Sequence, residues 1–113
     1  MTDVAFSLDG RELASASQDS TIRLWDVTLP GRPVFEAVLE GHGFIVSRVL
    51  FAQDGRGLVS VSRDKTVRLW DLKSGSLVRI LNGERTPLSD GMLSPDGSLI
   101  AVANMLNEVS LVA

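Results

Sequence analysis

Two segments of this chain have nearly the same sequence, LASASQDSTIRLWD at residues 13–26 and LVSVSRDKTVRLWD at residues 58–71. They lie 45 residues apart, and each ends on Trp-Asp. Self-similarity at a fixed period of about 20 to 50 residues is typical of repeat proteins, in which each unit buries its apolar faces against its neighbours. The chain is therefore expected to consist of repeated units rather than one irregular core.

An Asp-Gly pair lies at the same phase of each repeat and reveals a third, weaker copy. The pairs are Asp9-Gly10, Asp54-Gly55 and Asp96-Gly97. Asp-Gly between apolar runs predicts a tight hairpin, because glycine accepts the positive φ that such turns require. We assign a first repeat to about residues 1–40, a second to about 41–82 and a degenerate third to about 83–113.

The residue types between these turns are those of β-strands. Val, Ile, Leu, Thr and Ser fill the runs, while Gly, Pro, Asp and Asn separate them, and no segment keeps a helical period. We expect strands near residues 3–6, 12–17, 21–26, 33–39, 45–51, 57–62, 66–71, 76–81, 89–93, 98–103 and 108–112. The predicted fold class is all-β, with two four-stranded units and a third that lacks its outer strand.

The repeated sequence resembles the WD40 repeat, whose units are the four-stranded blades of a β-propeller. The resemblance implies a structural tetrad in the second blade, in which hydrogen bonds run from an indole to a hydroxyl, an imidazole and a carboxylate. Its members would be Trp70, Ser60, His42 and Asp64. Ser62 is an alternative hydroxyl that spacing does not exclude. A closed network of this kind would lock the strands to one another.

The other two units carry incomplete versions of the tetrad. The first supplies Ser15, Asp19 and Trp25, and its histidine would fall before Met1. In the third, the equivalent positions read Glu84, Val102, Leu106 and Val112. Replacement of all four residues together is expected, because a single buried polar member left without its hydrogen-bond partners would destabilise the fold. We expect the strands of the third unit to persist without the network.

Catalysis and metal binding find little support in the composition. The chain has one histidine and no cysteine, so a serine nucleophile would lack a free base and a transition metal would lack ligands. No Gly-x-Ser-x-Gly elbow surrounds any serine. We expect no enzymatic activity, no metal and no cofactor.

Charge and hydropathy bear on partners and location. The net charge is −3 and the basic residues are scattered, which argues against a nucleic-acid partner. Base stacking on Trp25 and Trp70, each two residues after an arginine, is the weaker alternative to their place in the tetrad. The apolar runs are short and no signal peptide is evident, so no membrane partner is expected. Together with the lack of cysteine, this favours the cytoplasm.

The resemblance also implies a function. WD40 propellers mostly act as platforms whose top face, near the central channel, binds peptides or protein domains. The positions that the family often uses correspond to Gln18, Ile45, Ser47, Arg63, Ser89 and Met105. An exposed Ile, Arg and Met cluster suits a protein interface. We expect a non-catalytic scaffold for protein interactions; the alternative is an accessory regulatory module of a larger multidomain signalling enzyme.

The number of repeats is too small for a closed ring. Propellers have about four blades or more, whereas 113 residues hold between two and three. An open row of blades exposes two faces that are built to be covered. We therefore expect either a fragment of a larger propeller or a chain completed by self-association.

Overall fold

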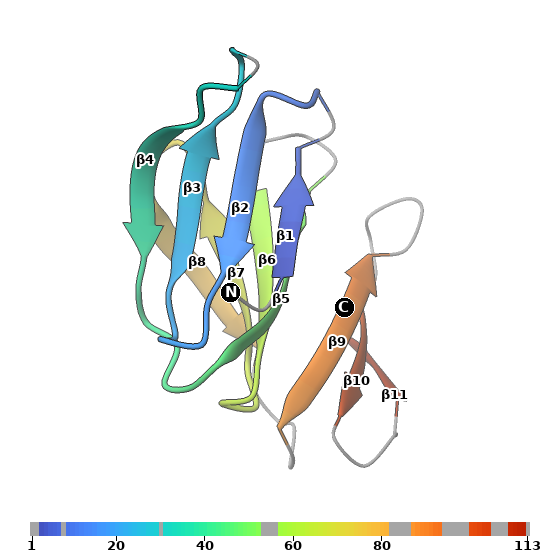
Figure 1. Ribbon diagram of the computed structural model, residues 1–113. Helices are drawn as coiled ribbons and strands as arrows, with labels where there is room; N and C mark the ends of the chain where they lie inside the picture. The colour runs from blue at the N-terminus through green and yellow to red at the C-terminus, as the bar shows by residue number, and fades with distance from the viewer. Residues whose placement is uncertain are drawn as a thin grey trace.

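The computed structural model describes residues 3–7, 9–29, 31–52, 57–81, 87–93, 100–104 and 109–112, and every regular element within them is a β-strand (Figure 1). Sheet 1 contains β1 (Asp3–Phe6), β2 (Glu12–Ala16), β3 (Ile22–Asp26) and β4 (Val34–Leu39). Sheet 2 contains β5 (Val46–Phe51), β6 (Gly57–Ser62), β7 (Val67–Asp71) and β8 (Ser76–Leu81). Sheet 3 contains β9 (Leu88–Leu93), β10 (Ile100–Asn104) and β11 (Val109–Val112).

The strands of each sheet pair with their neighbours along the chain, and every pairing is antiparallel. Two four-stranded sheets and a three-stranded one confirm the predicted all-β fold class of a partial propeller. The predicted strand ends that fall on described residues are correct to within one residue, whereas the predicted starts at residues 98 and 108 lie outside the described residues. The boundaries between repeats, near residues 40 and 82, stay predictions.

Tight turns join the strands where the sequence places small and polar residues. In the Asp-Gly turn of the first unit, Gly10 has a φ of 74° and the Ser7 hydroxyl donates to Asp9 Oδ1 at 2.7 Å. Asp54-Gly55 and Asp96-Gly97 lie outside the described residues. Ser20 and Lys65 have φ values of 76° and 75° at matching positions of the β2–β3 and β6–β7 turns. The two full repeats therefore agree in backbone conformation as well as in sequence.

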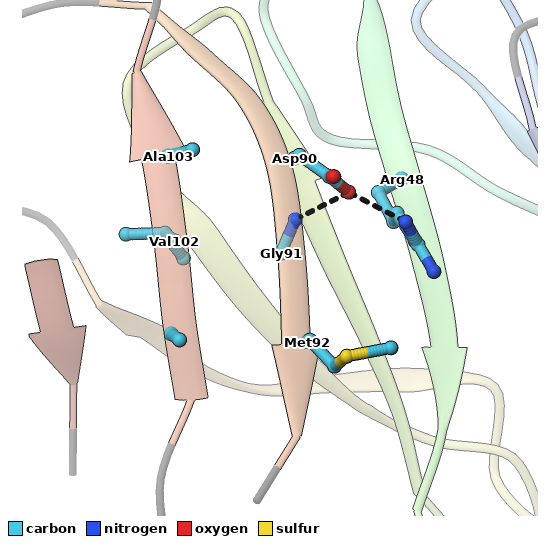
Figure 2. Close-up of a pocket in the computed structure, with 7 residues that line it drawn as sticks. Arg48, Asp90, Gly91, Met92, Val102 and Ala103 are labelled. Atoms are coloured by element: carbon cyan, nitrogen blue, oxygen red, sulfur yellow. Dashed lines mark hydrogen bonds and ion pairs between the residues drawn. The ribbon is translucent and has the colours of Figure 1, made fainter. Parts of the chain in front are cut away.

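The first strands of the three sheets lie side by side and are joined by one arginine. Strand β1 contacts β5, and β5 contacts β9. Arg48 on β5 pairs with Asp90 on β9 at 2.6 Å from Nη1 to Oδ1 (Figure 2), and its Nε lies 3.6 Å from Asp3 Oδ2 on β1. Asp3 Oδ2 also accepts a hydrogen bond from the Val49 amide at 3.1 Å. These contacts connect sheet 2 to both of its neighbours.

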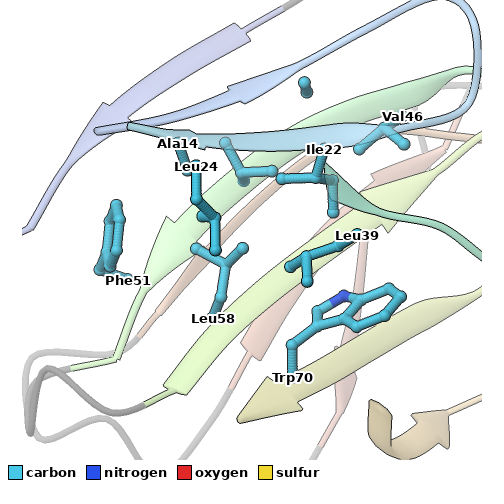
Figure 3. Packing of buried hydrophobic residues seen from close by; sticks show 10 residues of the cluster. Ala14, Ile22, Leu24, Leu39, Val46, Phe51, Leu58 and Trp70 are labelled. Carbon is cyan, nitrogen blue, oxygen red and sulfur yellow. The ribbon is translucent and has the colours of Figure 1, made fainter. Parts of the chain in front are cut away.

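Apolar side chains fill the space between successive sheets. Between sheets 1 and 2 lies a cluster that contains Ala14, Ala16, Ile22, Leu24, Leu39, Val46, Val49, Phe51, Leu58 and Trp70 (Figure 3). Between sheets 2 and 3 lies a second, with Val59, Val61, Val67, Leu88, Ile100 and Val102. Full burial of one such aliphatic side chain contributes about 1.5 to 3 kcal/mol. Sheet 2 has residues in both clusters, because it is covered on both faces.

Candidate functional site

Four side chains of sheet 2 and the segment before it form a continuous polar network. The Trp70 indole on β7 donates to Ser60 Oγ on β6 at 2.8 Å. Ser60 Oγ lies 2.6 Å from His42 Nε2, and His42 Nδ1 lies 2.7 Å from Asp64 Oδ2 in the β6–β7 turn. The structure thus brings the four residues together in the order that the resemblance implied.

The hydrogen positions in this network follow from donor and acceptor chemistry. The ionised Asp64 carboxylate only accepts, so His42 Nδ1 carries the proton and Nε2 accepts from the Ser60 hydroxyl. Burial lowers the pKa of His42 below its ordinary 6.5, although Asp64 acts in the opposite direction. A neutral imidazole with both nitrogens engaged leaves no free base for catalysis.

Asp64 has more partners than the sequence analysis assigned to it. Thr66 donates to Oδ1 from both its amide, at 2.9 Å, and its hydroxyl, at 2.5 Å, while the Gly43 amide donates to Oδ2 at 3.0 Å. Burial raises the pKa of Asp64, but the hydrogen bonds from Thr66, His42 and Gly43 outweigh it and hold the pKa at about 2. The recurrence of Thr two residues after the aspartate, at Thr21 and Thr66, was the signal that could have found this role.

Ser62, the alternative hydroxyl, has a different role. Its Oγ donates to the Ile45 carbonyl at 2.9 Å and accepts from the Asp64 amide at 3.0 Å. It therefore ties the β6–β7 turn to the segment before β5. Ser60, and not Ser62, bonds the indole.

The first unit has a weaker version of the network. Trp25 donates to Ser15 Oγ at 3.2 Å, and Asp19 Oδ1 accepts from the amide and hydroxyl of Thr21. Trp25 is half-buried and meets Phe35 edge-on, with ring centroids 5.4 Å apart. Trp70, by contrast, is 3% exposed. Because Trp70 is enclosed, its ring cannot stack on a nucleic-acid base.

In the third unit the position of the tetrad serine is apolar. Val102 lies on β10 and is buried in the cluster between sheets 2 and 3. Glu84 and Leu106 lie outside the described residues, as does the side chain of Val112. Where the sheet is described, packing has thus replaced the hydroxyl.

Five of the six predicted interaction residues lie at one edge of the sheets, where β2 and β6 end and β5 and β9 begin; the sixth, Met105, lies outside the described residues. The five are Gln18, Ile45, Ser47, Arg63 and Ser89. We call this edge the loop edge. Gln18 and Ser89 are exposed, whereas Ile45 and Arg63 are half-buried, so the expectation of an exposed Ile is wrong. The segment before β5 packs under the β6–β7 turn, since the Arg63 amide donates to the Ile45 carbonyl at 2.9 Å.

Phe44 is a further residue of the loop edge, and the sequence analysis missed it. Its side chain is 51% exposed, and it lies between Gly43, which bonds Asp64, and Ile45, which bonds Arg63. The backbone on both sides of this phenylalanine is therefore fixed. An exposed aromatic side chain on a fixed backbone is typical of the anchors of protein-binding surfaces.

The described part of the chain has neither a cluster of metal-ligand side chains nor a membrane-spanning helix. It holds no group of three His, Cys, Asp or Glu side chains that could bind a metal ion. It likewise has no helix of the length and hydropathy needed to cross a bilayer.

Comparison with known proteins agrees with this geometry. The family model for the WD domain, G-beta repeat, matches residues 1–26 and 33–71, which is more than half of the chain. No curated protein matches the chain. The matched residues contain both Trp-Asp segments and the whole network of His42, Ser60, Asp64 and Trp70. The chain therefore belongs to the WD40 repeat family.

Proposed function

We propose that this chain is a non-catalytic, cytoplasmic scaffold that binds a protein partner at its loop edge. WD40 repeats generally mediate protein interactions. The observation that carries the proposal is Phe44, an apolar ring held half-exposed on a backbone that hydrogen bonds fix on both sides. Rigid presentation lowers the entropy cost of binding, so such a residue suits an anchor.

The other predicted residues of the loop edge give this edge a mixed chemistry. Arg63 supplies a cation, Gln18 and Ser89 supply exposed hydrogen-bonding groups, and Ile45 supplies a half-buried apolar base. Aromatic residues and arginine are enriched at protein interfaces, whereas a small-molecule site would be concave. A peptide or the surface of a folded domain therefore fits this edge best.

The polar network supports a structural role for the residues that most resemble catalytic ones. His42 and Ser60 lie within hydrogen-bond distance, as they would in a nucleophile and base pair. However, Ser60 is fully buried and its hydroxyl is held between Trp70 and His42, so a substrate has no path to it. We assign these residues to stability.

The proposed scaffold is part of a ring that further blades complete. Support comes from sheet 1, whose face away from sheet 2 carries exposed Val4 and Phe6. Exposed apolar area of this kind on a sheet favours association.

Selection of peptides from a random library against the purified chain tests the proposal. Bound peptides should lose affinity about tenfold or more when Phe44→Ser or Arg63→Ala is introduced, because truncating an interface anchor costs about 1.4 kcal/mol or more. Lys73→Ala is the matched control, since Lys73 is exposed in the β7–β8 turn at the opposite edge of sheet 2.

Two outcomes would contradict the proposal. One is that no peptide is selected, and the other is that the selected peptides bind all three variants as tightly as the unchanged chain. Circular dichroism on each variant verifies that the sheets are intact, so that a loss of binding reports on the loop edge.

A further inference from the structure

Sheets 1 and 2 have equivalent faces, but only the face of sheet 2 is covered by another sheet. On sheet 2, the face toward sheet 1 carries Val49, Phe51 and Leu58 with Trp70. At the same positions of sheet 1, 45 residues earlier, stand Val4, Phe6 and Leu13 with Trp25. Because strand side chains alternate, this set lies opposite Ala14 and Ala16, which face sheet 2. We call it the open face of sheet 1.

The exposure of equivalent residues shows what the open face lacks. Val49 is fully buried whereas Val4 is 48% exposed, and Phe51 is 9% exposed whereas Phe6 is 64% exposed. The two faces have the same chemistry, and only that of sheet 2 is covered. Sheet 1 covers it with the small side chains of Ala14 and Ala16 and with the larger Ile22, Leu24 and Leu39, and the Asp3 carboxylate bonds the Val49 amide.

The far face of sheet 3 carries the small covering residues at the same positions. On the face opposite Gly91 and Val102 stand Ala101 and Ala103, which repeat Ala14 and Ala16. Asp90 repeats Asp3 on the same face, but its carboxylate turns back to Arg48 on β5. Met92 stands in the place of Ala5 and is 60% exposed. Sheet 3 therefore offers outward the same pair of small side chains that sheet 1 offers to sheet 2.

The surface is hollowed beside these residues, across β10, β9 and Arg48 of β5 (Figure 2). A cavity of about 220 Å³ opens there, lined by Asp90, Met92, Ala101 and Ala103 together with Arg48 of β5, Gly91 and Val102. Alanines leave this space because their side chains end at Cβ. Between sheets 1 and 2, Ala14 and Ala16 belong to one buried cluster with large side chains of the other sheet, Phe51 and Leu58 among them.

We propose that the far face of sheet 3 covers the open face of sheet 1 in a second copy of this chain. Phe6 and Leu13 of one copy would fill the cavity beside Ala101 and Ala103 of the next. Since the two faces differ, the contact is head-to-tail, and it closes into a ring when the rotation between copies allows. The inference deepens the completion by further blades proposed above and is independent of what the loop edge binds.

The charges at the proposed contact are compatible with it. Asp90 would come to the position where Asp3 now accepts from the Val49 amide, opposite Val4 of the second copy. The neighbouring carboxylate there is Asp3. Each of the two carboxylates already has an arginine within its own chain, because Arg48 pairs with Asp90 and lies 3.6 Å from Asp3. The contact therefore brings together two ion pairs rather than two bare carboxylates.

Light scattering on the whole chain and on three variants tests the contact. Phe6→Asp alters the open face of sheet 1, Met92→Asp alters the far face of sheet 3, and Val78→Asp is the control. Val78 is 66% exposed on β8 and belongs to neither face. We expect the unchanged chain and the control to show a mass of two or three chains, and each of the other variants to show 12.2 kDa. All three replaced side chains are more than half exposed, and thermal melts verify that the variants fold.

Mixing the two face variants is the decisive step. Phe6→Asp keeps an intact sheet 3 and Met92→Asp keeps an intact sheet 1, so the mixture should form a particle of one chain of each. A symmetric contact through sheet 1 alone predicts instead that Met92→Asp stays associated, and that result would overturn the proposal. A monomeric unchanged chain, or an aggregate that resists both substitutions, would overturn it as well. None of these outcomes bears on peptide binding at the loop edge.

Discussion

The Ser60 hydroxyl oxygen lies 2.6 Å from His42 Nε2, deep inside sheet 2. The same oxygen accepts from the Trp70 indole, so its own proton is directed to the imidazole. That arrangement requires His42 to be neutral and to carry its proton on Nδ1, toward Asp64. The stability of the sheet therefore depends on one protonation state of one residue.

Removal of the imidazole should destabilise the fold. His42→Ala leaves Ser60 and Asp64 without their partner and opens a small cavity, and we expect a loss of about 2 to 4 kcal/mol in the free energy of unfolding. Arg63→Ala is the control and should stay within about 0.5 kcal/mol of the unchanged chain, as surface changes usually do. Urea unfolding measures both, and a neutral His42→Ala would remove the structural role of the network.

The serine positions allow a comparison between the two repeats. Ser60→Val should cost about 2 to 4 kcal/mol, because it leaves the buried Trp70 indole and His42 Nε2 unpaired. Ser15→Val should cost less, since Trp25 is half-buried and water can reach its indole. Urea unfolding of the two variants at equal concentration gives the difference. Equal losses at the two sites would show that the histidine adds nothing to the indole and hydroxyl pair.

Much of this site could be predicted because the repeat marks it. Ser, Asp and Trp recur at one spacing in both units, and the turns between the strands recur with them. The choice between Ser60 and Ser62 could not be predicted, because residues two apart on a strand point to the same face. The position of each serine along β6 determines its partner. Ser62 reaches the backbone of the segment before β5, and Ser60 reaches the Trp70 indole.

The contacts between sheets could not be predicted from the sequence either, for a different reason. Arg48 pairs with Asp90 and approaches Asp3, which lie 42 and 45 residues away in the chain. Such pairs depend on how the sheets stack, and no local pattern encodes that geometry. Phe44 escaped notice because its counterpart in the first repeat would lie before Met1, so the repeat gave no comparison.

Stability should fall as the solution is acidified. The pKa of His42 is lowered below 6.5 in the fold, so its contribution is complete above pH 6.5 and is lost as pH falls through the lowered pKa. The pKa of Asp64 is lowered from 3.8 to about 2, so its contribution is complete above pH 3.8 and is lost toward pH 2. Urea midpoints across this range should decline in two stages.

The histidine stage can be separated from the carboxylate stage. His42→Ala should remove the decline below pH 6.5 and leave the later one, to which other carboxylates contribute. Hydrogen bonds also lower the pKa values of Asp9, Asp19 and Asp26. A decline near pH 6 that persists in His42→Ala would contradict the assignment, because the chain has no other histidine.

The packing of sheet 3 on sheet 2 depends on a glycine. A Cβ built on Gly91 of β9 would lie 2.7 Å from Val61 Cγ2, closer than such atoms approach. Gly91→Ala should therefore destabilise the chain by about 1 to 3 kcal/mol, as overpacking of a core does. The double variant Gly91→Ala/Val61→Ala should recover part of that loss, because the second change removes the clashing methyl groups. Additive losses in urea unfolding would place the two residues out of contact.

The protonation state of the His42 imidazole is the property on which the polar network of sheet 2 depends most directly. His42 is the only histidine, so nitrogen-15 NMR of the labelled chain reports on it without ambiguity. At neutral pH we expect a neutral ring with the proton on Nδ1, the form that a buried bond to Asp64 and a hydroxyl donor at Nε2 require. A charged ring, or a neutral ring with the proton on Nε2, would contradict the network that holds these strands together.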